Sequence, residues 1–226
     1  MAIAKDIGRQ LLAQAPQVAP GMASTVLRRA LDLAIDGFSK VPGAKATAAS
    51  ALQKTTNSEA AIDHLVKQHV AMAGAQGFVT NLGGLATLAV SIPANVSGVT
   101  IVQCRMVAAI AHLRGYDIED PRVRSAILMC LMGPGTTKDA IQSHELPSSP
   151  MAVATAPVYD SALDATIAEK VFSNLVEQVG GKRVTLLAGK RIPGIGGAVG
   201  AGTDGYATWN TGRFAKQEFR NRRAAS

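Results

Sequence analysis

A glycine-rich stretch near the C-terminus contains a pattern that occurs in nucleotide-binding loops. Residues Arg191 to Asn210 read RIPGIGGAVGAGTDGYATWN, and Gly200 to Gly205 form a G-x-G-x-x-G. In a dinucleotide fold this pattern lies between a strand and a helix, where backbone amides meet a pyrophosphate. The preceding residues, Pro193 to Val199, are themselves glycine-rich and show no strand pattern. The phosphate-binding interpretation is therefore weak.

If the same stretch forms a helix, its residue spacing predicts a surface for close packing. Two adjacent rows consist mostly of small residues: Gly196, Gly200, Asp204, Thr208 and Gly212, and beside them Gly197, Ala201 and Gly205. Such rows let two helix backbones approach closely. Each interior glycine costs about 1 kcal/mol relative to alanine, a cost that only packing against a helix or a lipid chain would offset. We therefore interpret Gly196, Gly200 and Gly205 as helix-packing residues.

Four polar residues in apolar surroundings form a candidate ligand-binding set: Gln103, Arg105, His112 and Asp204. Asp204 lies on the small-residue row. Arg105 is the first charge after Val70 to Cys104, a run without Asp, Glu, Lys or Arg. Because a lone buried charge is costly, we expect Arg105 and Asp204 to pair inside the protein. The alternative is that Asp204 faces water at a helix kink.

Signals for catalysis are weak, and we assign no catalytic residue, metal or cofactor. His64 and His69 are five residues apart, so they lie on different helix faces and lack a third ligand at the usual spacing. In Ser143-His144-Glu145 the side chains are adjacent and point apart, which prevents a proton relay. A hydrolase that uses Arg105, Asp204 and His112 in a buried pocket stays an alternative.

The composition favours closely packed helices and an anionic partner. Of the 226 residues, 47% are hydrophobic but only 4% are aromatic, which disfavours aromatic-rich sandwich cores. The net charge of +7 favours lipid headgroups or other anions. Cys104 and Cys130 lie in apolar runs and are expected to be buried thiols, as suits a cytosolic protein. Lys5, Asp6 and Arg9 interrupt any signal-peptide core.

The periodicity of the apolar residues predicts an all-α fold, a compact bundle with glycine-rich helix–helix interfaces. The expected helices are Ser24–Phe38, Thr56 to beyond Val70, Pro93–Arg114 with Gly115 as its cap, Asp120 to Gly133-Pro134-Gly135, Asp160–Val179 stopped by Gly180-Gly181, and Gly194–Phe219. Thr56 and Glu59 form a capping-box pattern. Asp120-Pro121 is a helix-start pattern. Residues Leu146 to Pro157 are expected to form a surface loop.

The uncharged run from Val70 to Cys104 is long enough to span a bilayer, but its composition argues against a simple transmembrane helix. It contains Gln76, Asn81 and Asn95, whose amides would be costly in hydrocarbon. We favour two buried helices broken around Gly83-Gly84 and Pro93. Membrane insertion stays the alternative.

Two long blocks of the sequence resemble the signature blocks of the EcsC protein family. They are GFVTNLGGLATLAVSIPANVSGVTIVQCRMVAAIAHLRGYD (Gly77 to Asp117) and RIPGIGGAVGAGTDGYATWNTGRFAKQEF (Arg191 to Phe219). The segments LDLAIDGF (Leu31 to Phe38) and AIDHLVKQHV (Ala61 to Val70) are also similar. The resemblance covers most of the chain. We expect one EcsC-like helical domain over 1–226, with an amphipathic N-terminal part (1–55) and a variable loop region (136–160).

The resemblance implies a bacterial, membrane-associated protein, and no agreed enzymatic activity comes with it. The family takes its name from a gene in an operon that also encodes an ABC transporter. Its signature positions fall here on Gln103, Arg105, Gly115, Tyr116, Asp117, Pro193, Gly196, Gly200 and Asp204. Whether they serve the fold or a ligand is open.

Basic residues cluster at the C-terminus and could bind an anionic surface: Arg213, Lys216, Arg220, Arg222 and Arg223. The alternative, to which we give equal weight, is that these residues form a charged tail that is only solvated. We expect a non-catalytic protein, peripheral to the cytoplasmic face of the inner membrane, that binds anionic lipid or an acyl chain. An accessory subunit that binds a membrane transporter is a further alternative. A homo-oligomer is compatible with the sequence, and no nucleic-acid partner is expected because nucleic-acid-binding motifs are lacking.

Overall fold

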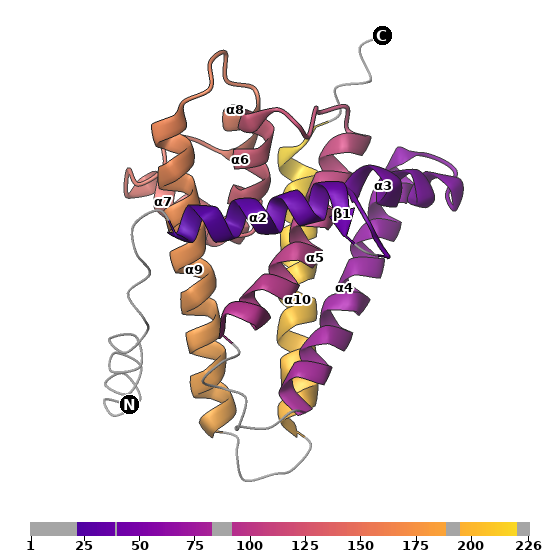
Figure 1. Ribbon diagram of the computed structural model, residues 1–226, viewed down its shortest axis with the longest axis vertical. Helices are drawn as coiled ribbons and strands as arrows, with labels where there is room; N and C mark the ends of the chain where they lie inside the picture. Colours follow the sequence, from indigo (N-terminus) through magenta and orange to yellow (C-terminus); the bar gives the residue numbers. More distant parts are fainter. Residues whose placement is uncertain (1–21, 39, 83–91, 189–194, 221–226) are drawn as a thin grey trace.

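The computed structural model describes the backbone of residues 22–38, 40–82, 92–188 and 195–220, and the side chains of 24–38, 40–75, 98–178 and 202–220. The fold is all-α, as predicted (Figure 1). The helices are α2 (Met22–Asp36), α3 (Ala44–Gln53), α4 (Ser58–Leu82), α5 (Ile92–Leu113), α6 (Pro121–Cys130), α7 (Gly133–Gln142), α8 (Pro150–Ala154), α9 (Ser161–Ala188) and α10 (Ile195–Glu218). Strands β1 (Gly37–Phe38) and β2 (Val41–Pro42) form a small antiparallel hairpin.

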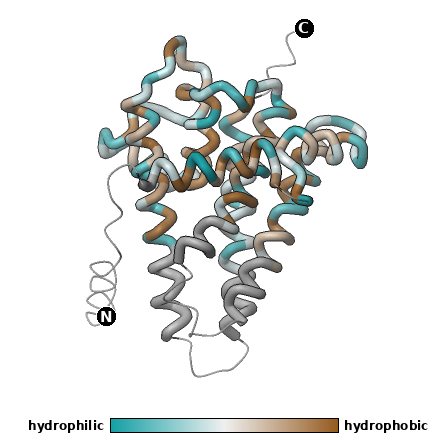
Figure 2. The backbone as a smooth tube through the Cα atoms, in the orientation of Figure 1, coloured by the Kyte–Doolittle hydropathy of each residue, from teal (hydrophilic) through white to brown (hydrophobic). Residues whose placement is uncertain are grey.

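Helix α5 is the central element of the fold. All side chains from Val102 to Ala111 are buried, because α5 packs against α2, α3, α4 and α10. The long helices α4, α9 and α10 run along the long axis, and α2 crosses them (Figure 1). Hydrophobic and hydrophilic residues alternate along the described helices, as expected of helices with one buried face (Figure 2). A polar residue placed on the middle of α5 is therefore buried.

Two local signals set helix ends as predicted. Asp120 is the N-cap of α6, and its side chain accepts a hydrogen bond from the backbone N–H of Arg122, 2.9 Å away. Pro121 follows in the first turn, where a missing N–H costs nothing. After α5, Gly115 has a φ of 86°, a left-handed conformation that favours glycine.

The predicted capping box of α4 is wrong. The N-cap contact comes from Asn57, whose Oδ1 accepts a hydrogen bond of 2.9 Å from the N–H of Ala60. Glu59 does not turn back to Thr56 but pairs with Arg114 and, at 3.4 Å, with Lys216. Two cations from other helices attract this carboxylate more strongly than one exposed backbone amide does.

One predicted helix end and one predicted loop region are also wrong, and one predicted break is displaced. Gly180 and Gly181 do not stop α9, which continues to Ala188, because interior glycine weakens a helix without ending it. The expected break at Gly133-Pro134-Gly135 is present but lies slightly earlier, since α6 ends at Cys130 and Gly133, with a φ of 77°, begins a second helix, α7. The expected loop region 136–160 contains most of α7 and all of α8, and Leu146 and Val153 in it are buried.

Helix α3 has no counterpart among the predicted helices. Its buried face consists of Ala44, Thr47, Ala48 and Ala51, so its apolar periodicity is carried by alanine and is faint in the sequence. In the uncharged run, α4 ends at Leu82 and α5 begins at Ile92, which matches the expected break; Gly83-Gly84 lies outside the described residues. Within the described residues, no helix combines the length and the apolar character needed to cross a bilayer.

Candidate functional site

Helix α5 carries three of the four candidate residues. Gln103 and Arg105 are buried, whereas His112 is half-buried. His112 lies seven residues beyond Arg105, about 10 Å further along the helix axis. The amide Nε2 of Gln103 donates a hydrogen bond of 3.2 Å to the Oγ1 of Thr208 on α10. Asp204 lies one turn before Thr208 and is also buried, so Gln103 joins α5 to the helix that carries Asp204.

The expected ion pair between Arg105 and Asp204 is not formed. The guanidinium of Arg105 points to α4, where its Nε lies 3.4 Å from the Nε2 of His69 and its Nη2 lies 3.7 Å from the sulfur of Met72. Positions two residues apart differ by about 200° around a helix, so Gln103 and Arg105 cannot both face α10. Arg105 therefore does not pair with Asp204, as the hydrolase alternative assumed.

His69 is the residue of this site that the sequence interpretation missed. It is completely buried, and its Nδ1 lies 2.8 Å from the backbone carbonyl of Leu65, so we assign the proton to Nδ1 and the acceptor role to Nε2. Burial lowers the pKa of His69 to about 4, and the charge of Arg105 also lowers it. His69 is therefore neutral near pH 7. The sequence does contain a signal for the burial of His69, since this residue continues the apolar row of Ile62 and Leu65 at helical spacing.

Glycines of α10 lie directly against α4 and α5. A Cβ added to Gly205 would lie 3.7 Å from the Cγ1 of Val70, in ordinary contact. A Cβ added to Gly212 would lie only 2.9 Å from the Cγ2 of Val66 and 3.2 Å from the Cε of Met106. The close approach of α10 is therefore to α4 as well as to α5. Gly196 and Gly200 lie outside the described side chains, and their packing role stays a prediction.

Comparison with protein families identifies the family of this chain. The family model described as the EcsC protein family matches residues 11–223. The chain belongs to the EcsC protein family. Neither the curated proteins nor the solved structures contain a match to it. In this EcsC protein the two signature blocks include α5 and α10, the helices that Gln103 and Gly212 bring together.

The residues of the C-terminal basic cluster of this EcsC protein differ in their contacts and exposure. The Nζ of Lys216 lies 2.7 Å from Asp63 and 3.4 Å from Glu59, so its charge is neutralised within the fold. Arg213 is exposed, and its Cζ lies 4.9 Å from the centroid of the Trp209 ring. Arg220 is also exposed. Arg222 and Arg223 lie outside the described residues.

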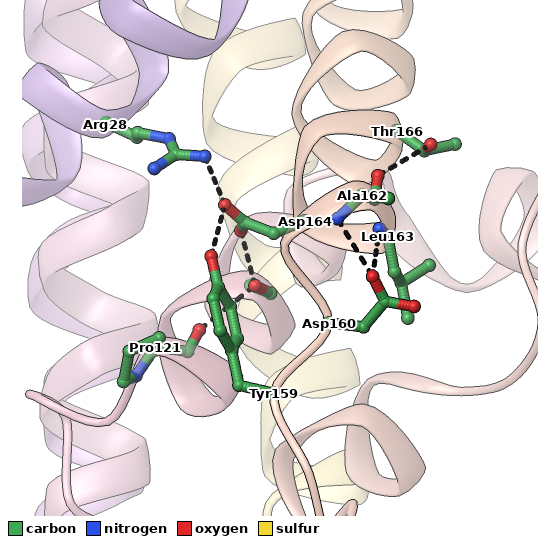
Figure 3. Close-up of polar contacts among 9 residues, drawn as sticks. Arg28, Pro121, Tyr159, Asp160, Ala162, Leu163, Asp164 and Thr166 are labelled. Carbon is green, nitrogen blue, oxygen red and sulfur yellow. Dashed lines mark hydrogen bonds and ion pairs between the residues drawn. The ribbon is translucent and has the colours of Figure 1, made fainter.

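A second polar cluster, around Asp164, connects three helices of the EcsC protein (Figure 3). Asp164 of α9 forms an ion pair with Arg28 of α2, and it accepts hydrogen bonds of 2.6 Å from the hydroxyl of Ser125 and 3.1 Å from that of Tyr159. The carboxylate of Asp164 is the base that touches Ser125, but Arg28 and Tyr159 also engage it and Ser125 is buried, so we assign this arrangement a structural role. It serves to hold α2, α6 and α9 together.

The two cysteines, which could otherwise be reactive, are buried. Cys104 and Cys130 form no disulfide, as predicted, and both are fully enclosed. Burial raises the pKa of Cys104 to about 12 and that of Cys130 well above its ordinary value, which makes both thiols unreactive. Within the described residues, no three His, Cys, Asp or Glu side chains lie close enough to hold a metal ion.

Proposed function

We propose that this EcsC protein is a non-catalytic protein that binds anionic lipid at the cytoplasmic surface of the inner membrane. The observation that carries the proposal is the α10 stripe, formed by Tyr206, Trp209 and Arg213 on the exposed face of that helix. Tyr206 is 66% exposed and Trp209 40% exposed. Their ring centroids are 5.9 Å apart, and Arg213 covers the far side of the tryptophan.

The α10 stripe has the chemistry of a membrane interface. Tryptophan and tyrosine have apolar rings with one polar tip, which suits the headgroup region of a bilayer. The two carboxylates of α10 do not oppose an anionic surface there, because Asp204 is buried and Glu218 accepts a hydrogen bond from the N–H of Met151. The exposed cations Arg213 and Arg220 are thus left to attract anionic headgroups, each by about 1 kcal/mol near the surface.

The residue beside Tyr206 in the α10 stripe packs on the start of an uncharged run of the sequence. Gly205, the neighbour of Tyr206, packs on Val70, the first residue of the run to Cys104 that carries no charge. This arrangement supports insertion of the adjoining surface to the depth of the headgroups and contact with acyl chains. The net charge of +7 supports the cytoplasmic leaflet, whose anionic lipids give it a negative potential.

Trp209 allows a direct test, because it is the single tryptophan of the chain. On titration with vesicles of phosphatidylcholine and phosphatidylglycerol, its emission should shift to shorter wavelength, and bromine-labelled lipid should quench it. Added salt should weaken binding, since exposed charges are screened. Vesicles of phosphatidylcholine alone should bind much more weakly.

Charge reversal distinguishes membrane binding through the α10 stripe from binding through the overall charge of the protein. Arg213→Glu changes the charge by two at the α10 stripe, so it should weaken binding by about 2 kcal/mol, roughly thirtyfold. Lys40→Glu makes the same change beside the β1–β2 hairpin and should have a much smaller effect. Equal losses in both variants, or equal binding to neutral and anionic vesicles, would contradict the proposal. Binding only in the presence of membrane protein would favour the accessory-subunit alternative.

A further inference from the structure

Arg105 is a buried cation whose contacts with the described residues are both to neutral groups. Only 4% of the residue is exposed. Its hydrogen-bond partners are the neutral ring of His69, at 3.4 Å, and the thioether of Met72, at 3.7 Å. Both distances are long, and a thioether is a weak acceptor. The guanidinium, which stays charged at any ordinary pH, therefore lies in the fold without strong compensation.

No carboxylate of the described chain neutralises Arg105. Every Asp and Glu except Asp6 belongs to the residues whose side chains are described, and none of them forms an ion pair with it. Other arginines in the fold do have such partners: Arg28 pairs with Asp164, Arg114 with Glu59, Arg122 with Asp120, and Arg124 with Asp32. Arg105 thus differs from these arginines in being more buried and lacking an anion.

His69 accepts from the Nε of Arg105 only, so the edge formed by the two Nη groups does not depend on that contact. The Nδ1–H of His69 donates to Leu65, so its Nε2 lone pair receives the Nε–H of Arg105. This contact fixes the plane of the guanidinium. The Nη2 group lies 3.7 Å from the sulfur of Met72, the one contact that it forms with the described side chains. A guanidinium edge with two parallel N–H groups matches the oxygens of a carboxylate or a phosphate.

A flexible and partly exposed side chain, Met72, lies against the guanidinium. Met72 is 37% exposed, and its sulfur lies against the Nη2 of Arg105. Methionine is unbranched and changes rotamer easily, so it can move aside without a change in the backbone.

We propose that Arg105 is the binding residue of an internal oxyanion site, which takes a carboxylate or phosphate group past Met72, with His69 as the positioning residue. This site does not depend on the membrane surface proposed for α10, since the α10 stripe and the guanidinium lie on different helices. A fatty acid, the headgroup of a lipid, and a small soluble anion could each supply the oxyanion.

Isothermal titration with three probes distinguishes these sources. Laurate carries a carboxylate and an alkyl chain, dodecanol carries the chain alone, and sodium phosphate supplies the oxyanion alone. Laurate monomers should bind the full chain with saturation, and Arg105→Met should weaken this binding at least tenfold. Dodecanol should bind weakly and equally to both proteins. If sodium phosphate binds the wild type and displaces laurate, the oxyanion alone is the ligand, which also supports the site.

Two variants keep the test decisive. Arg213→Met should weaken vesicle binding but leave laurate affinity unchanged, so that failure of the membrane proposal and failure of this site can be told apart. Without ligand, Arg105→Met should melt at the same temperature as the wild type or higher, because it removes an uncompensated buried charge. A lower melting temperature, laurate affinity within twofold of the wild type, or absence of binding by both laurate and phosphate would each overturn the proposal.

Discussion

The protonation of His69 should make the fold sensitive to mild acid. In the folded protein burial lowers the pKa of His69 to about 4, whereas an unfolded chain has the ordinary value of 6.5. As the pH falls below 6.5, the unfolded state therefore binds a proton that the folded state does not, and the free energy of unfolding decreases. At 1.36 kcal/mol per pH unit, the full difference is about 3 kcal/mol, reached near pH 4. About 2 kcal/mol of it should be lost by about pH 5.

Urea unfolding followed by far-ultraviolet circular dichroism measures this loss. The comparison is between the wild type and His69→Gln, at about pH 7.5 and about pH 5, without fatty acid. Glutamine can still donate to Leu65 but does not titrate, so the variant should lose about 2 kcal/mol less stability over this interval than the wild type does. His64→Gln, on the same helix at a half-buried position, is the matched control for the substitution itself. Equal pH dependence in the wild type and His69→Gln would refute the reasoning.

Two further predictions concern the packing of α10 and the network around Asp164. Gly212→Ala should destabilise the protein by about 1–2 kcal/mol, because its Cβ would lie 2.9 Å from Val66, whereas Gly202→Ala meets open space and should stabilise it by up to about 1 kcal/mol. Equal shifts in urea midpoint for the two variants would contradict the packing argument. Asp164→Ala removes an ion pair and two hydrogen bonds and should cost about 2–3 kcal/mol, while Asp139→Ala, at an exposed position, should change stability by less than about 0.5 kcal/mol. A loss below about 1 kcal/mol for Asp164→Ala would show that this network is not structural.

The sequence by itself determined the features that depend on neighbouring residues. Asp120-Pro121 starts α6 and Gly115 follows the end of α5, because capping and left-handed backbone act within one turn. The helical periodicity determined the all-α class, and the two long blocks determined the family. The local rules failed where a distant group competed. Glu59 does not form the predicted capping box, because its carboxylate pairs with Arg114 and Lys216, which lie on or beside other helices.

Only the tertiary structure decided the partners of the polar residues on α5. The sequence showed that Arg105 and Asp204 are charges in apolar surroundings, and charge alone made them a plausible pair. The rotation of α5 about its own axis instead directs Gln103 to α10 and Arg105 to His69 on α4. That rotation is fixed by the packing of the helices around α5, chiefly α2, α3, α4 and α10. A periodicity identifies which face of a helix is buried, but it does not identify which helix covers that face, because any apolar surface satisfies the hydrophobic effect equally well.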